Sequence, residues 1–105
     1  MIITQGESYP IYIRLWQDGQ TLTPAMISAL KVCIGGYLSK TYGSGEVKYD
    51  PDQEEWYIWP TEEETLNLPD GSHAVCCHVK YPDGTKLIEQ VGRIRVKPCG
   101  CGGRS

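Results

Sequence analysis

Alternation of apolar and polar side chains is the clearest pattern in this sequence. Between residues 9 and 17 one set of alternate positions is apolar and comprises Tyr9, Ile11, Ile13 and Leu15. The intervening positions hold Tyr12, Arg14 and Trp16. A strand with one buried and one exposed face has this period of two. The pattern predicts one strand over 9–17, followed by a turn at Asp18-Gly19.

Six more segments are rich in β-branched or aromatic residues and are bounded by turn signals. They cover residues 30–34, 37–42, 46–49, 54–59, 72–81 and 86–96. Two short helical turns are expected between them. Thr23 has the residue type of a helix N-cap, and Pro24 follows it at the position of the first helical residue. This pair predicts a helical turn over 24–29. Thr61 and Glu64 have the spacing of a capping box, which predicts a turn over 61–66.

About seven short strands without a long amphipathic helix predict an all-β, immunoglobulin-like antiparallel β-sandwich, with a small barrel as the alternative. The expected domain covers residues 1–97, and the Cys/Gly-rich residues 98–105 are expected to form a flexible tail. The alternation also predicts the core residues: Ile11, Ile13, Leu15, Val32, Trp56, Ile58, Val75, Val79, Ile94 and Val96.

Charge and hydropathy exclude several classes of partner. The net charge is −3, and the cationic residues occur singly along the chain, so no nucleic-acid partner is expected. No apolar stretch has the length of a membrane span, and no secretion signal is recognisable. We therefore expect synthesis in the cytoplasm and no membrane partner.

The five cysteines are an odd number and are predicted to be thiols. Cys77 shares the phase of the core positions on its strand, whereas Cys76 points the other way. Cys33 is out of phase with Val32, which argues against a bridge from Cys33 to Cys77. The pairs at 76–77 and 99–101 lack the spacing of a zinc site, so no metal or cofactor is expected.

Catalytic patterns are weak in this chain. Glu62, Glu63 and Glu64 are consecutive and fan outward into water, and capping explains Glu64. No nucleophile motif or phosphate-binding loop is present. We therefore expect a protein that is not an enzyme.

Surface aromatic residues are the main candidates for partner binding. The segment 37–49 is short and interrupted by glycine, as expected of an edge strand that a partner strand extends. Its candidate contacts are Tyr37, Leu38, Tyr42 and Tyr49, although Lys40 and Lys48 would oppose such pairing. Trp16 and Trp59 lie on strand faces opposite to the predicted core and are further candidates.

The order of these segments resembles short structural proteins of phages and prophages of Gram-positive gut bacteria, and is similar in layout to the amino-terminal module of baseplate upper proteins. The resemblance covers residues 2–97. It rests on the motifs Thr4–Pro10, Leu22-Thr23-Pro24, Trp56-Tyr57-Ile58, Leu68–Gly71 and Gly92–Val96.

The resemblance implies a structural or adaptor module of a tail or baseplate. Its expected partners are other virion structural proteins or copies of itself, first in the host cytoplasm and then in the virion. Two alternatives remain open: a module that binds carbohydrate or a host protein through the surface aromatics, and a small thiol or metal protein.

Overall fold

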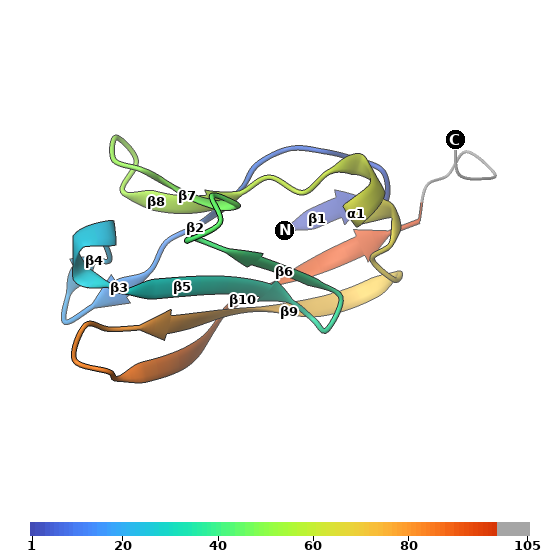
Figure 1. Ribbon diagram of the computed structural model, residues 1–105. Coiled ribbons are helices and arrows are strands. Elements are labelled where there is room, and N and C mark those ends of the chain that lie inside the picture. Colours follow the sequence, from blue (N-terminus) through green and yellow to red (C-terminus); the bar gives the residue numbers. More distant parts are fainter. Residues whose placement is uncertain (99–105) are drawn as a thin grey trace.

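Two β-sheets face each other in the computed structural model, which describes residues 1–98 (Figure 1). The larger sheet has five strands, in the order β1 (Ile2–Thr4), β10 (Lys86–Lys97), β9 (Gly71–Lys80), β5 (Ala29–Ile34) and β6 (Leu38–Thr41). The smaller sheet has three strands, in the order β2 (Ile11–Ile13), β8 (Glu55–Ile58) and β7 (Val47–Asp50). The predicted all-β sandwich is confirmed.

Strands that are neighbours in a sheet are often distant in sequence. In the larger sheet β9 lies between β10 and β5, and in the smaller sheet β8 lies between β2 and β7. Strand β1 was not predicted, and it pairs in parallel with the end of β10. Both β6 and β7 lie at sheet edges, as expected for the segment 37–49.

The predicted strand over 9–17 is wrong in one respect, because the structure divides it in two. Strand β2 pairs with β8 only as far as Ile13, which lies opposite Trp56. Trp56 is the second residue of β8, which begins at Glu55. The chain then leaves this sheet, and β3 (Trp16–Gln17) pairs with β4 (Gln20–Thr21) in a separate ribbon. The alternation continues across the break, since Leu15 is buried between exposed neighbours.

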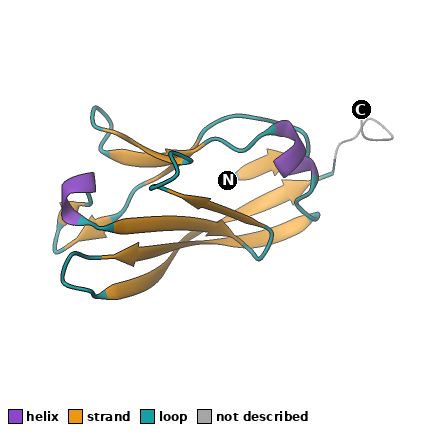
Figure 2. Cartoon of the chain, in the orientation of Figure 1, coloured by secondary structure: helices purple, strands orange, loops and turns teal. Residues whose placement is uncertain are grey.

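Two short helical connectors join the strands (Figure 2), and their capping differs. The first is a 3-10 turn over Pro24–Met26, shorter than predicted, and the Thr23 side chain does not cap it. Ala29 instead begins β5. The second is α1 (Glu62–Leu66), where the capping box predicted for Thr61 and Glu64 is present in both directions.

The core lies between the two sheets. All ten predicted core residues are buried, and each is at most 6% exposed. Cys77 is also buried, whereas Cys33 and Cys76 are half-buried on the other side of the larger sheet. Inward positions on facing strands therefore behave as the alternation predicts.

One buried cation joins the edge strand β6 to α1. The Lys40 amine lies 2.5 Å from a Glu64 carboxylate oxygen and 3.5 Å from one of Glu46. Burial alone would raise the pKa of Glu64, but the hydrogen bonds from Lys40 and Thr61 outweigh it and lower the pKa from 4.5. Lys40 therefore packs inward and is not an exposed lysine that would discourage strand pairing at the sheet edge.

This pair predicts a pH dependence. Because the folded-state pKa of Glu64 is lowered, its contribution to stability is present above about pH 4.5 and is lost as the pH falls through the folded value. We expect Glu64→Gln to lose less stability than the wild type on acidification, measured by urea unfolding. Glu63→Gln, at an exposed neighbouring position, serves as the control and should keep the wild-type pH dependence. Equal slopes for all three proteins would contradict this assignment.

Candidate functional site

The outer face of the five-stranded sheet gathers most of the cationic side chains, and we call it the basic face. Its cations share one phase of the alternation, opposite to the buried residues of the same strands. They are Lys31, Lys80, Lys86, Arg93, Arg95 and Lys97.

Strand β10 shows how the sequence builds this face. Ile94 and Val96 are buried, so the residues that alternate with them point outward. Arg93 and Arg95 lie opposite Ala74 and Ser72 of β9, and the Arg93 guanidinium donates a hydrogen bond to the Ser72 hydroxyl. The basic face thus follows from a period of two within an ordinary strand.

Acidic residues are nearly missing from these five strands. Glu89 is the one carboxylate within them, and it lies opposite the buried Cys77. Directly opposite residues of an antiparallel pair share a face, so Glu89 belongs to the other side of the sheet. The strand residues of the basic face therefore carry six cations and no carboxylate.

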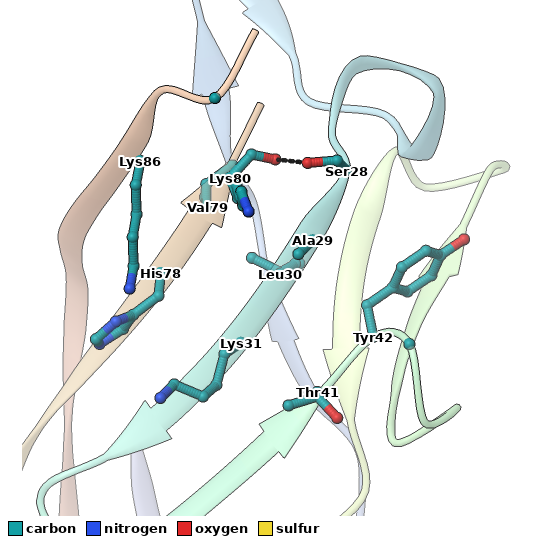
Figure 3. Close-up of a pocket in the computed structure, with 12 residues that line it drawn as sticks. Ser28, Ala29, Leu30, Lys31, Thr41, Tyr42, His78, Val79, Lys80 and Lys86 are labelled. Carbon is teal, nitrogen blue, oxygen red and sulfur yellow. Dashed lines mark hydrogen bonds between the residues drawn. The ribbon is translucent and has the colours of Figure 1, made fainter. Parts of the chain in front are cut away.

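A groove of about 470 Å³ crosses the basic face near the β9–β10 turn (Figure 3). Lys31, His78 and Lys86 stand on three neighbouring strands along it, and Lys80 lies opposite Lys86. Ala29 and Leu30 of β5 also line the groove. The groove offers several N–H donors and positive charge to an anionic group.

The facing of Lys80 and Lys86 has an energetic cost. Like charges directly opposite each other on neighbouring strands destabilise a sheet by a few tenths of a kcal/mol up to about 1 kcal/mol. Within residues 1–98, none of the six cations of the basic face forms an ion pair. A bound carboxylate would relieve this repulsion.

Carboxylates are concentrated elsewhere in the molecule. The segment 46–64 holds eight of the 13 acidic residues and one cation, Lys48. It comprises β7, β8, the turn between them and the start of α1, which belong to the smaller sheet and its connections. Charge is thus divided between the two sides of the sandwich.

The linear order of the cations along the chain does not reveal this division of charge. Lys31 and Lys80 are far apart in sequence, but both strands are neighbours in the larger sheet. The available signal was the phase of the cations: Arg93, Arg95 and Lys97 all alternate with the predicted core positions Ile94 and Val96.

The structure does not bring the six predicted contact residues together. Tyr42 and Tyr49 are half-buried and pack on Trp56, with ring centroids 5.1 Å and 5.0 Å from it. Tyr37 is exposed and contacts the His73 ring, while Leu38 is half-buried on β6. Trp16 and Trp59 are exposed, on the ribbon and at the end of β8 respectively.

The edge of β6 offers fewer free backbone groups than its position implies. Tyr42 donates its amide to the Leu30 carbonyl of β5, so alternate residues, Ser39 and Thr41, point their backbone groups outward. Thr41 is already occupied, because its amide bonds the Glu46 carboxylate and its carbonyl accepts from the Glu46 amide. The backbone amide of Leu38 points to β5, so a proline at this position would remove a hydrogen bond between β6 and β5 and not a free donor of the edge.

The thiols of Cys33, Cys76 and Cys77 do not belong to any metal-ligand cluster of the described residues. No cluster of three or more His, Cys, Asp or Glu ligands occurs within residues 1–98. Burial raises the pKa of the Cys77 thiol to about 12. Cys33, Cys76 and Cys77 are free thiols, as predicted, whereas Cys99, Cys101 and the predicted tail from 99 onward lie outside the described residues.

Of the three consecutive glutamates of α1, one has a structural role and two are exposed to solvent. Glu64 caps the helix and pairs with Lys40, while Glu62 and Glu63 are exposed.

No helix of the described chain is long and apolar enough to cross a bilayer. Comparison with protein-family models, curated proteins and solved structures finds no match for this chain.

Proposed function

We propose that this protein is a non-catalytic assembly module that binds a second copy of itself through the basic face. The acid-rich segment 46–64 of one copy would lie against the basic face of the next. Such a contact joins two different surfaces, so it builds rings or open chains rather than a closed symmetric pair. This behaviour fits the tail or baseplate role that the resemblance to phage structural modules implies.

The division of charge carries the proposal. Six cations that form no ion pair occupy one face, and segment 46–64 holds eight carboxylates, five of which form no ion pair within the described residues. The other three are Glu46 and Glu64, which pair with Lys40, and Glu55, which pairs with Arg14. Opposite fields on two surfaces of the same molecule attract copies to each other and set their orientation. A protein whose surfaces only keep it dissolved would intersperse the two signs.

Two exposed apolar side chains favour a protein partner over a polyanion. Ile88 lies opposite His78 on the basic face and is 62% exposed, and Ile2 lies opposite Arg95 and is 56% exposed. Protein interfaces combine apolar contact with a charged rim. The overall charge of −3 would in addition repel a nucleic acid at long range.

Charge reversal on the basic face tests the proposal. We expect wild-type protein to associate at low ionic strength and to dissociate near 1 M salt, where the screening length is about 3 Å. Lys31→Glu/Lys86→Glu should weaken this association by about tenfold or more, because it places carboxylates opposite carboxylates. Sedimentation velocity over a range of concentrations measures the effect.

The control is Arg14→Glu/Lys48→Glu, which changes the net charge equally but makes the acid-rich side more negative, so it should not weaken association. Equal weakening by both variants would mean that only net charge matters, and no association by the wild type would refute self-assembly. Tight binding of heparin or duplex DNA by the wild type would assign the face to a polyanion instead. Loss of association in Trp59→Ala, without loss in Lys31→Glu/Lys86→Glu, would show that the contact lies on the smaller sheet.

A further inference from the structure

Two cysteines lie directly opposite each other in the middle of the larger sheet. Cys33 of β5 is in register with Cys76 of β9. Both side chains point to the basic face, because Val32 and Cys77, the next pair in the register, are buried in the core. Both thiols are half-buried, so a small reagent reaches them from the solvent side.

The backbone spacing at this pair suits a disulfide. The Gly35 amide donates to the Ala74 carbonyl at 2.9 Å, which makes that pair a hydrogen-bonded one. Hydrogen-bonded pairs recur every second residue, so Cys33 and Cys76 form the next such pair. Their Cα atoms are then about 5.5 Å apart, within the range of about 4.4–6.8 Å found across disulfides.

The side chains need a modest adjustment. The Cys33 sulfur now lies 3.9 Å from the Ser39 hydroxyl on β6, a weak contact that a rotation toward Cys76 would break. Directly opposite Cβ atoms are about 4.5–5.5 Å apart, slightly farther than the roughly 3.5–4.5 Å of a relaxed disulfide. The bridge would therefore be strained and easily reduced.

We propose that Cys33 and Cys76 form a dithiol modification site that is converted to a cross-strand disulfide by exchange with a low-molecular-weight disulfide. One thiolate attacks the reagent disulfide, forms a mixed disulfide and releases one thiolate of the reagent. The second cysteine thiolate attacks the protein sulfur of the mixed disulfide and releases the other. The two protein thiols lose two electrons and two protons, and the reagent leaves as two thiols.

Cys77 is excluded from this chemistry. It is fully buried, it lies opposite Val32, and neighbouring strand residues such as Cys76 and Cys77 point to opposite faces. Burial also keeps the Cys77 thiol protonated. Within the described chain, Cys33 and Cys76 are the one pair of cysteines in register on a common face.

The test is disulfide mapping in a Cys99→Ser/Cys101→Ser background, which removes the two other thiols. After incubation with oxidised glutathione and alkylation, mass spectrometry should show a Cys33–Cys76 linkage, two of three thiols lost and Cys77 alkylated only after unfolding. Reductant should restore all three thiols. Adding Cys33→Ser or Cys76→Ser should leave a glutathione adduct on the remaining partner and no intramolecular bridge.

Two results would overturn the proposal. The first is glutathione on both Cys33 and Cys76 without a linkage, which would mean that the sheet does not allow the bridge. The second is a linkage that includes Cys77, which would contradict the register of β5 and β9. The experiment does not depend on self-association, so it is independent of the proposed function.

Discussion

Replacing Trp56 with alanine is expected to lower the free energy of unfolding by about 3–5 kcal/mol. The indole is fully buried between the sheets, and the rings of Tyr42 and Tyr49 pack on it. Its Nε1–H donates to the Leu22 carbonyl at 3.0 Å, so truncation also leaves a buried acceptor unpaired. Urea unfolding followed by far-ultraviolet circular dichroism measures the loss.

The matched control is Trp16→Ala, because Trp16 is 55% exposed. An exposed substitution of this kind changes stability by about 0.5 kcal/mol or less. If the two variants unfolded at the same denaturant concentration, the faces of β8 would have to be exchanged.

Thr65→Val is expected to cost about 2–3 kcal/mol although the two side chains have almost the same shape. Thr65 is fully buried, and its hydroxyl accepts the Gly6 amide at 2.9 Å. The same hydroxyl lies 2.8 Å from the Glu7 carbonyl and 3.0 Å from that of Glu62. Valine would leave the Gly6 amide and the Glu7 carbonyl without this partner.

The same substitution at Thr23 serves as the control, because Thr23 makes no side-chain capping bond. Equilibrium unfolding should show a change of about 0.5 kcal/mol or less for Thr23→Val. Hydrogen exchange adds a local readout, since the Gly6 amide should exchange faster in Thr65→Val alone. Unchanged exchange at Gly6 would contradict the role assigned to the hydroxyl.

Local chemistry explains why most of the core could be predicted. A strand with one wet face carries its buried set at alternate positions, so Trp56 and Ile58 are recognisable without knowing their partners. The capping box of α1 is equally local, since Thr61 and Glu64 satisfy each other's backbone amides. These features depend only on residues close in sequence.

Other features depend on which strands are neighbours, which a local pattern does not contain. After Ile13 the chain leaves β8 and continues into the β3–β4 ribbon, and Cys33 meets Cys76 because β5 lies beside β9. The basic face has the same origin, since its cations come from three strands. Pairing between distant segments decides all three.

The aromatic candidates show the same limit. Tyr42 and Tyr49 flank an edge segment, and alternation gives no reason to place them against Trp56. The structure half-buries both rings there, so truncating either one would change stability as well as any contact. Their role in partner binding stays a prediction, and Trp59 is a cleaner probe because it is 57% exposed.

A charge-swap mixing experiment tests the central claim, that the basic face of one copy binds the acid-rich segment of another. Lys31→Glu/Lys86→Glu loses cations from the basic face, and Asp52→Lys/Glu63→Lys loses carboxylates from segment 46–64. Each variant alone should associate more weakly than the wild type at low ionic strength, because the charge on one of its two binding surfaces is reduced. Their equimolar mixture should form a one-to-one complex, because the unchanged acid-rich segment of the first variant binds the unchanged basic face of the second with an affinity near that of the wild type. A mixture that stays monomeric, under conditions in which the wild type associates, would contradict the account.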